Sequence, residues 1–253
     1  MLNKSLSFIL VISLSLSTGL AGTLPADTNE NTRLAAPADL DGFFTAADAF
    51  FQLHVQAGLV NYKGISKNPA SLDKLVEMIA TADLSASNVN TKIAFYINAY
   101  NILTIKNIVR QWPMKSPLDD KGFFNVTQFK IAGEMLTLND LEAKKLRPDP
   151  RVHFVLVCGA KGCPTIMNSA YMPGKVQAQL DMQTQKALDN PNFIRVDAAS
   201  KKVLISEIFN WYEKDFTSKS GTVKAYINAN RTEPIPEGYS IGYYTYDWSV
   251  NSQ

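Results

Sequence analysis

Apolar residues recur with the period of an α-helix along the first part of the chain. Between residues 40 and 56 they fall three or four positions apart, which predicts an amphipathic helix. A shorter helix is indicated by Leu72, Leu75, Met78 and Ile79. The segment from Thr91 to Gln111 is apolar almost all round and is followed by Pro113. It therefore predicts a buried central helix that ends before the proline.

The hydrophobic period changes after Phe123. Apolar residues flank the turn sequence Ala132-Gly133-Glu134 on both sides, which predicts a β-hairpin. Thr137 to Asp140 resembles a capping box that opens a helix through Leu146. The next segment, Arg151 to Cys158, is almost continuously apolar, so it predicts a strand buried on both faces at the centre of a sheet.

The last third alternates between the two periods. The pattern predicts a helix over 176–187, a hairpin from 193–196 and 203–205, a helix that Ser206 caps and that runs to Phe216, and a final strand over 241–246. Helices and hairpins come in blocks, without regular βαβ alternation. The fold class is therefore expected to be α+β, with a mainly antiparallel sheet packed against the buried central helix and further helices. We expect residues 38–253 to form a single domain.

The amino terminus has the pattern of a secretory signal peptide. Lys4 precedes an apolar run that ends at the small residues around Ala21, so we expect a signal peptide over residues 1–21. Residues 22–37 are polar and lack periodicity, which is typical of a flexible leader. The apolar run is shorter than the roughly 20 residues that span a bilayer. The mature protein is therefore expected to be exported, periplasmic or extracellular, without a membrane span after processing.

Composition limits the possible chemistry. Lys and Arg total 25 against 23 Asp and Glu, so bulk charge gives no argument for a nucleic-acid partner. The chain has only two His and two Cys. Their spacings match no zinc-ligand pattern, so we expect neither a metal site nor a cofactor.

The two cysteines lie in a glycine-containing segment after the predicted central strand. Cys158 is a candidate nucleophile, and the 159–162 loop is a candidate oxyanion donor. Lys161 is placed to lower the thiol pKa. Export to an oxidising compartment leaves a second interpretation, in which Cys158 and Cys163 form a structural disulfide. In a regular strand His153 would lie about 17 Å from Cys158 on the opposite face, so the two cannot form a pair directly. The base for Cys158 would then be His54. Alternatively, the loop would turn back and bring His153 close to Cys163.

Two further groups of polar residues lie among apolar ones. Asn98 and Asn101 are at i and i+3 on the most apolar helix, so either they bind substrate or they hold loop backbone. Glu142 lies among leucines, where it would act either as an acid or base with a raised pKa or as a solvated carboxylate beside a lysine.

Four motifs resemble one family. They are Asp149-Pro-Arg-Val-His-Phe-Val-Leu-Val-Cys-Gly-Ala-Lys-Gly-Cys-Pro164, Phe95-Tyr-Ile-Asn-Ala-Tyr-Asn101, Ile208-Phe-Asn-Trp-Tyr212 and Tyr246-Asp-Trp-Ser-Val-Asn251. Together they resemble the domain of unknown function 547 family over about residues 60–251. That family is similar in outline to thiol peptidases of the papain and transglutaminase type, which implies a hydrolase.

The resemblance also implies roles for individual residues. The family's Cys corresponds to Cys158, its Cys-Pro to Cys163-Pro164, its Asn pair to Asn98 and Asn101, and its motif Glu to Glu142. Together with the residue patterns, we expect catalytic roles for Cys158, Glu142 and His153, and substrate-binding roles for Tyr96, Asn98, Asn101, Lys161 and Cys163. Members commonly have Ile-Glu-His where this chain has Leu141-Glu142-Ala143, and often Ser-Cys-Pro where it has Gly162-Cys163-Pro164.

Two functions follow as hypotheses. The first is an exported thiol-dependent hydrolase or transferase that acts on amide bonds of a peptide-like or small-molecule substrate. The second is a non-catalytic exported binding module whose cysteines form a structural pair.

Overall fold

The computed structural model describes residues 39–147 and 149–253. The predicted signal peptide and leader lie outside the described residues. None of the helices in the described ranges is both long enough and apolar enough to cross a membrane.

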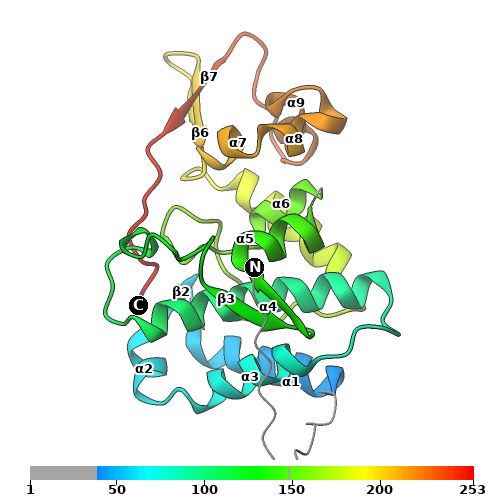
Figure 1. Ribbon diagram of the computed structural model, residues 1–253. Coiled ribbons are helices and arrows are strands. Elements are labelled where there is room, and N and C mark those ends of the chain that lie inside the picture. Colours follow the sequence, from blue (N-terminus) through cyan, green and yellow to red (C-terminus); the bar gives the residue numbers. More distant parts are fainter. Residues whose placement is uncertain (1–38, 148) are drawn as a thin grey trace, which may run out of the picture. The chain divides into compact units, whose positions relative to one another are not determined.

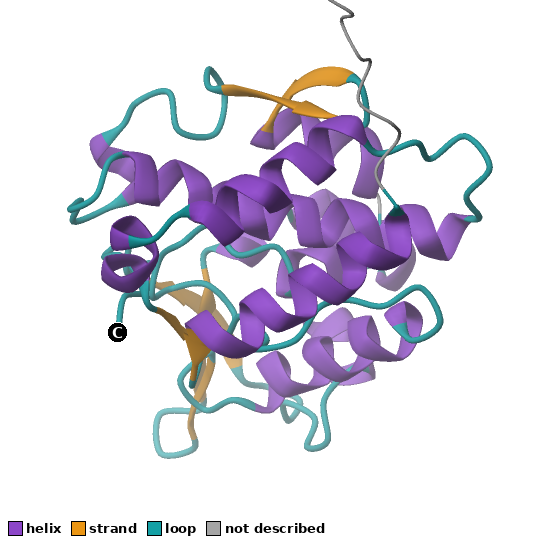
Figure 2. Ribbon diagram, turned by 90° about the horizontal axis from the view of Figure 1, so that it is seen from below, coloured by secondary structure: helices purple, strands orange, loops and turns teal. Residues whose placement is uncertain are grey.

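Helices predominate in the described chain, and strands are confined to small groups (Figure 2). In chain order, the elements are α1 (Leu40–His54), β1 (Val55–Gln56), β2 (Leu59–Val60), α2 (Tyr62–Lys67), α3 (Ala70–Thr81), α4 (Val89–Arg110), the 3-10 turn η1 (Pro117–Asp119), β3 (Gln128–Ile131), β4 (Glu134–Thr137), α5 (Leu138–Leu141), the π-helical turn η2 (Glu142–Leu146), the 3-10 helix η3 (Pro150–Phe154), α6 (Val176–Asp189), β5 (Ile194–Asp197), β6 (Lys202–Ser206), α7 (Ile208–Trp211), α8 (Glu213–Ser220), α9 (Val223–Ala229) and β7 (Ser240–Tyr244).

Helix α4 is the central element that the sequence predicts. The Asn88 side chain accepts a hydrogen bond from the Thr91 amide and so caps its first turn. The helix is buried over most of its length and contacts α2, α3, α5, η2 and α6 (Figure 1). Each fully buried leucine or isoleucine on it contributes roughly 2 kcal/mol of transfer free energy. This burial explains why the helix lacks a polar face.

The strands form three small sheets, and the α+β class is confirmed. The pairs β1–β2, β3–β4 and β5–β6 are antiparallel, whereas β7 pairs with β6 in parallel. The predicted hairpin turn lies between β3 and β4, where Ala132 and Gly133 both have positive φ. The predicted capping box is also present, since Thr137 and Asp140 each bond the other's backbone amide.

The predicted central strand over 151–158 is wrong. The segment begins as the 3-10 helix η3, and its first turn is capped by Asp149, which accepts from the Arg151 amide. The remainder runs as irregular chain to Cys158. Pro150 has a fixed φ and favours such a first turn, whereas an apolar run by itself does not distinguish a strand from other buried chain. The predicted helix after Ser206 is also two helices, α7 and α8, which meet at Tyr212.

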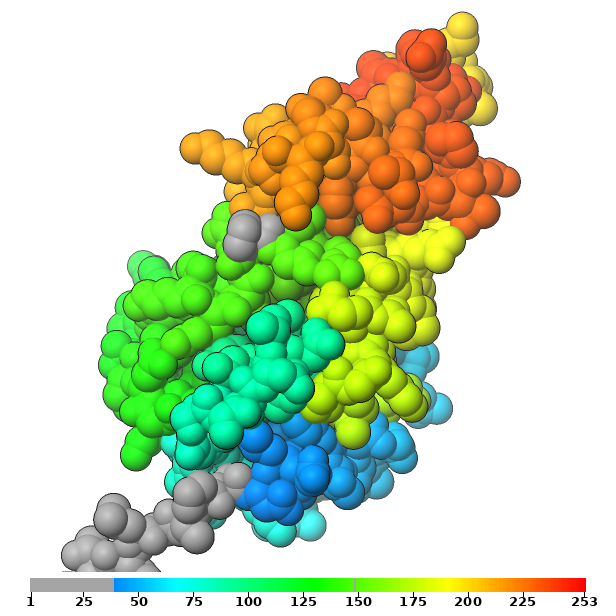
Figure 3. Space-filling model, turned by 90° about the vertical axis from the view of Figure 1, so that its right-hand side faces the viewer, coloured from blue at the N-terminus to red at the C-terminus, as the bar shows by residue number. Residues whose placement is uncertain are grey.

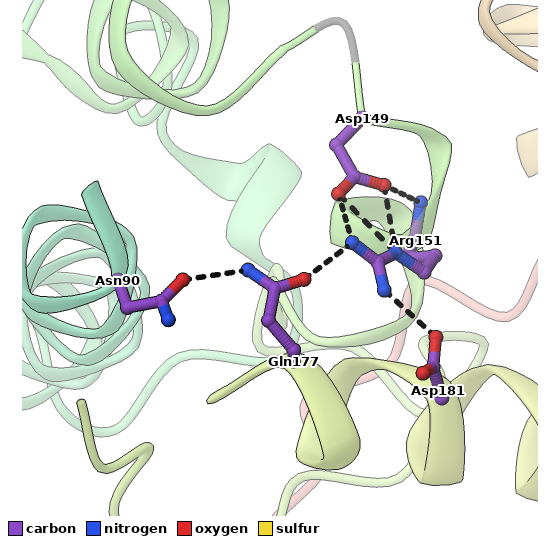
Figure 4. A network of polar contacts seen from close by, with 5 residues as sticks. All are labelled: Asn90, Asp149, Arg151, Gln177 and Asp181. Atoms are coloured by element: carbon purple, nitrogen blue, oxygen red, sulfur yellow. Dashed lines mark hydrogen bonds and ion pairs between the residues drawn. The ribbon is translucent and has the colours of Figure 1, made fainter. Parts of the chain in front are cut away.

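Arg151 anchors η3 to its neighbours. Its guanidinium bonds Asp149, Asp181 and Gln177, and Gln177 in turn bonds Asn90 at the start of α4 (Figure 4). This network connects η3 to α6 and α4, and so fixes the segment that leads to Cys158.

Two hydrophobic clusters fill the described part of the chain. The larger surrounds α4 and includes α1 to α3, and the smaller is built from β5, β6 and α7 to α9. At the surface, α1 in blue and the C-terminal elements in orange and red lie at opposite ends of the described part of the chain (Figure 3). After β7 the chain returns to the larger cluster, where Asn251 accepts from the Val60 amide. Cys163 packs against both clusters, so the cysteine segment lies where they meet.

Candidate functional site

A cavity of about 700 Å³ lies at this meeting of the two clusters. Its walls bring together three predicted catalytic residues, Cys158, Glu142 and His153, and also Cys163. Aromatic rings complete the wall, among them Tyr100, Phe124, Trp211, Tyr212, Tyr246 and Trp248. Because the 151–158 strand is absent, the expected separation of His153 and Cys158 on opposite strand faces does not apply. His54, the alternative base, is not among the residues that line this cavity.

The two cysteines of the chain form a disulfide in the wall of the cavity. Both are partly buried. The backbone amide of Cys158 points to Cys163 Sγ at 3.1 Å, and the Tyr246 hydroxyl lies 3.1 Å from each sulfur. The structure therefore selects the disulfide from the two sequence interpretations, and it places the bond where a ligand in the cavity would touch it.

The loop between the cysteines does not provide the expected oxyanion donors at two of its amides. The Lys161 amide donates to the Ser249 carbonyl, and the Gly162 amide donates to the Asp247 carbonyl. These bonds hold the loop against the returning C-terminal chain. The Lys161 side chain is exposed and is not among the cavity-lining residues.

Glu142 and His153 are two of the polar residues in the wall, and Asp215 contacts His153 from outside the cavity lining. His153 Nε2 lies 2.8 Å from Asp215 Oδ2, and His153 Nδ1 lies 3.6 Å from Glu142 Oε1. Arg147 makes a bidentate pair with Asp215, with distances of 2.6 and 2.8 Å. Glu142 Oε1 is buried and has no hydrogen-bond partner among the residues that the structure describes. The helical turn η2 places this carboxyl toward the cavity, and Asp215 of α8 orients the imidazole.

The electrostatics of this group separate the roles of its members. Burial raises the pKa of Glu142 to about 7, against the opposing effects of Arg147 and the Tyr212 hydroxyl. Burial lowers the pKa of His153 to about 4, although Asp215 acts in the opposite direction. Burial acts to raise the pKa of Asp215, but Arg147 and His153 together outweigh it and hold that pKa below its ordinary value. At neutral pH the imidazole is thus neutral, Asp215 is ionised, and Glu142 is close to its midpoint.

These charge states assign the imidazole proton. An ionised Asp215 can only accept, so the hydrogen of neutral His153 lies on Nε2. Nδ1 then presents a lone pair toward Glu142 Oε1. A proton on Glu142 turns two facing acceptors into a donor and an acceptor, which is consistent with the raised pKa of this carboxyl.

The two asparagines of α4 hold backbone instead of lining the cavity. Asn98 donates to the Tyr171 carbonyl at 2.8 Å and accepts from the Tyr171 amide at 2.9 Å. Asn101 donates to the Val155 carbonyl and accepts from the Val157 amide, both at 2.9 Å. Asn101 thereby fixes the chain immediately before Cys158, which makes it a positioning residue.

Tyr96 also lies away from the cavity. It is half-buried, and the Lys145 ammonium lies 5.8 Å from its ring centroid. Of the five residues expected to bind substrate, the structure therefore brings only Cys163 to the cavity wall.

The sequence patterns did not reveal several residues of the site. Tyr246 and Trp248 belong to a recognised motif, but aromatic residues at strand spacing are more often core than cavity wall. Asp215 has no local signal, since its partners Arg147 and His153 are more than 60 positions away along the chain. In the described ranges, no group of three or more His, Cys, Asp or Glu is arranged to hold a metal ion.

The fold and the site thus define an α+β protein with a cavity lined by a disulfide, a buried carboxyl and aromatic rings. The family model described as "Protein of unknown function, DUF547" matches residues 84–187, so this segment is similar to that family. The matched segment includes α4, η2, η3 and both cysteines. Neither the search of curated proteins nor the search of solved structures gives a match to the chain.

Proposed function

We propose that the chain is an exported, thiol-dependent hydrolase or transferase that acts on amide bonds of a peptide-like substrate. One observation carries the proposal: Cys158 lines the same 700 Å³ cavity as Glu142, whose pKa is about 7, and His153. A thiol nucleophile in one cavity with a group that exchanges protons near neutral pH is the minimum that acyl transfer needs.

The proposed nucleophile is Cys158 after reduction of the disulfide. Its thiolate attacks the amide carbonyl carbon, and the Tyr246 hydroxyl, 3.1 Å from the sulfur, can turn its single hydrogen to this thiolate when Cys163 is a thiol. Burial raises the pKa of Tyr246, so the phenol keeps its proton at neutral pH.

Glu142 supplies the proton transfer in this proposal. It takes the proton of the Cys158 thiol and returns it to the nitrogen of the leaving amine, so that the C–N bond breaks and a thioester forms. Water then releases the acid in a hydrolase, and a second amine takes the acyl group in a transferase. His153, which is held by Asp215, faces the carboxyl and presents Nδ1 as an acceptor toward its protonated form. The imidazole therefore does not need to contact the sulfur. Glu142 also serves as the base although this chain has Ala143 where family members commonly have a histidine.

The wall of the cavity favours a substrate with an apolar or aromatic group beside the amide. Trp211 and Trp248 stack with their ring centroids 5.7 Å apart, and Tyr246 packs 4.8 Å from Trp248. Rings in this arrangement bury apolar groups through large contact areas.

The test uses the purified protein with and without reductant and a peptide library, with cleavage or amine exchange followed by mass spectrometry. We expect turnover only after reduction, its loss in Cys158→Ala, and turnover without reductant in Cys163→Ser, which cannot form the disulfide. Circular dichroism checks the fold of each variant. Full activity of Cys158→Ala would refute the proposal.

Export is tested separately. Amino-terminal sequencing of protein recovered from outside the cytoplasm is expected to begin at Gly22. Recovery of the chain only inside the cytoplasm, with Met1 intact, would contradict export.

A second candidate function is a non-catalytic binding module, and the disulfide together with the occupied loop amides favours it. In this case a ligand fills the aromatic cavity without reaction. The same library experiment separates the two functions, because a binding module retains peptides in reduced and oxidised form alike and cleaves none.

A further inference from the structure

We propose that the Cys158–Cys163 pair exchanges electrons with thiols and disulfides of cysteine-containing peptides that enter the cavity, with Cys163 as the attacking thiolate. This activity goes beyond acyl transfer and does not depend on it. It rests on where the disulfide lies and on which groups surround each sulfur.

The first observation is that the disulfide lies at an accessible position. A disulfide that only braces a fold is usually enclosed by packed side chains, whereas this bond lies in the wall of a 700 Å³ cavity and both cysteines are partly exposed. Exchange requires an external sulfur to approach along the S–S axis, so access to the bond is a precondition. The cavity is large enough for a cysteine side chain with flanking residues.

The hydrogen bonds around the sulfurs give the second argument, because they distinguish the two cysteines. The backbone amide of Cys158 donates to Cys163 Sγ at 3.1 Å, and the Tyr246 hydroxyl donates to the same sulfur at 3.1 Å. Apart from the disulfide itself, Cys158 Sγ has the Tyr246 hydroxyl as its one polar contact in the described part of the chain. Donors stabilise a thiolate more than a thiol, so after reduction the negative charge is favoured on Cys163.

The carboxyl in the same wall gives the third argument. Glu142 has a buried oxygen that lacks a hydrogen-bond partner within the described ranges, and it lines the cavity with both cysteines. Resolution of a mixed disulfide requires a group that removes the proton from the second thiol. Glu142 is such a group, and its pKa near 7 lets it work in either direction.

The reaction balances in two steps. The Cys163 thiolate attacks one sulfur of the peptide disulfide, which forms a mixed disulfide and releases the other peptide sulfur as a thiolate. Cys158 then loses its proton to Glu142 and attacks Cys163 Sγ, which forms the Cys158–Cys163 bond and releases the second peptide thiolate. Two electrons pass from the protein dithiol to the peptide disulfide. A dithiol protein or peptide restores the reduced form by the reverse sequence.

The first experiment asks whether the bond reacts in the folded protein. The purified protein is treated with dithiothreitol and then with oxidised glutathione, without denaturant, and free thiols are counted by alkylation and mass spectrometry. We expect complete reduction and reoxidation while the circular dichroism spectrum is retained. A bond that is reduced only after denaturant is added overturns the proposal.

The second experiment tests the assignment of the two sulfurs with matched serine variants. Cys158→Ser keeps the backbone donor to Cys163, so it is expected to form a stable glutathione adduct with oxidised glutathione. Cys163→Ser is expected to form its adduct about tenfold more slowly, the factor that corresponds to one hydrogen bond to a charged group. Equal rates, or a faster reaction of Cys163→Ser, overturn the assignment.

A third measurement excludes a purely structural explanation. The pKa of the single thiol in Cys158→Ser, followed by thiolate absorbance, is expected at least about one unit below the ordinary cysteine value. Adding Tyr246→Phe to this variant is expected to raise it again, whereas an unchanged pKa contradicts the role of the phenol. None of these assays follows amide cleavage. Because Cys163→Ser cannot form the disulfide, its turnover of peptide amides tests acyl transfer separately, whether or not the disulfide exchanges.

Discussion

Replacement of Glu142 by glutamine should change how the stability of the protein depends on pH. The carboxyl is 7% exposed, and burial raises its pKa from 4.5 to about 7. In the unfolded chain the same group ionises near its ordinary pKa. Between about pH 4.5 and pH 7 the folded protein therefore binds one proton more at this position than the unfolded chain does.

The magnitude follows from that difference. At 1.36 kcal/mol for each pKa unit, the free energy of unfolding loses about 3 kcal/mol as pH rises from about 4.5 to about 7. The sign is that of a raised pKa: the stabilisation is complete below the unfolded pKa and is lost as pH rises through the folded one. Glutamine has no proton to lose, and its amide can donate to His153 Nδ1, which lies 3.6 Å from Glu142 Oε1.

The assay is urea unfolding of the oxidised protein at half-unit steps from pH 4 to pH 9. The free energy of unfolding of wild type minus that of Glu142→Gln is expected to fall by about 3 kcal/mol between pH 4.5 and pH 7.5 and then to level off. Glu77→Gln, at an exposed position on α3, is the matched control. A difference that stays constant over this range would refute the argument, because Glu142 would then ionise as an ordinary surface carboxyl does.

Three further substitutions or treatments test other parts of the structure. Asn98→Ala leaves the buried amide and carbonyl of Tyr171 without partners, so urea unfolding should show a loss of about 2–4 kcal/mol; a loss below about 1 kcal/mol would contradict this. Gly159→Ala forces a side chain onto a residue with φ of +80°, and its Cβ would overlap the Ile108 side chain of α4. Thermal unfolding should therefore show a loss of at least about 1 kcal/mol, while an unchanged melting temperature would count against the close approach. Reduction of the Cys158–Cys163 bond releases a short loop, so the free energy of unfolding should fall by about 2 kcal/mol in reductant; Cys163→Ser should then show no effect of reductant.

Much of the fold is predictable because its signals are local. Helix α4 follows from a long apolar run, an asparagine cap and a proline just beyond its end. The β3–β4 hairpin follows from Gly133 at a turn that needs positive φ, and the start of α5 follows from the reciprocal bonds of Thr137 and Asp140. In each case residues within a few positions of one another fix the backbone, so no knowledge of tertiary contacts is needed.

The backbone of the segment before Cys158 cannot be predicted from local signals. An apolar run says that the chain is buried but not which backbone it adopts, since burial can be satisfied by a strand, a helix or irregular chain. Here the backbone groups of Val155 and Val157 pair with the Asn101 side chain, more than 50 positions earlier. Because the carboxamide of Asn101 takes the place of a neighbouring strand, this segment does not join a sheet. His153 and Cys158 are therefore not held on opposite faces of a strand.

The sequence by itself determined which residues were available for chemistry at this site. It indicated both cysteines, Glu142 and His153, because they are scarce or polar residues within apolar surroundings. Only the tertiary structure decided that these four line one cavity and that the cysteines are bonded. It also decided that Asn98 and Asn101 hold backbone. These outcomes depend on contacts between segments tens of positions apart, whose approach is set by the packing of two hydrophobic clusters and is not encoded in any local pattern.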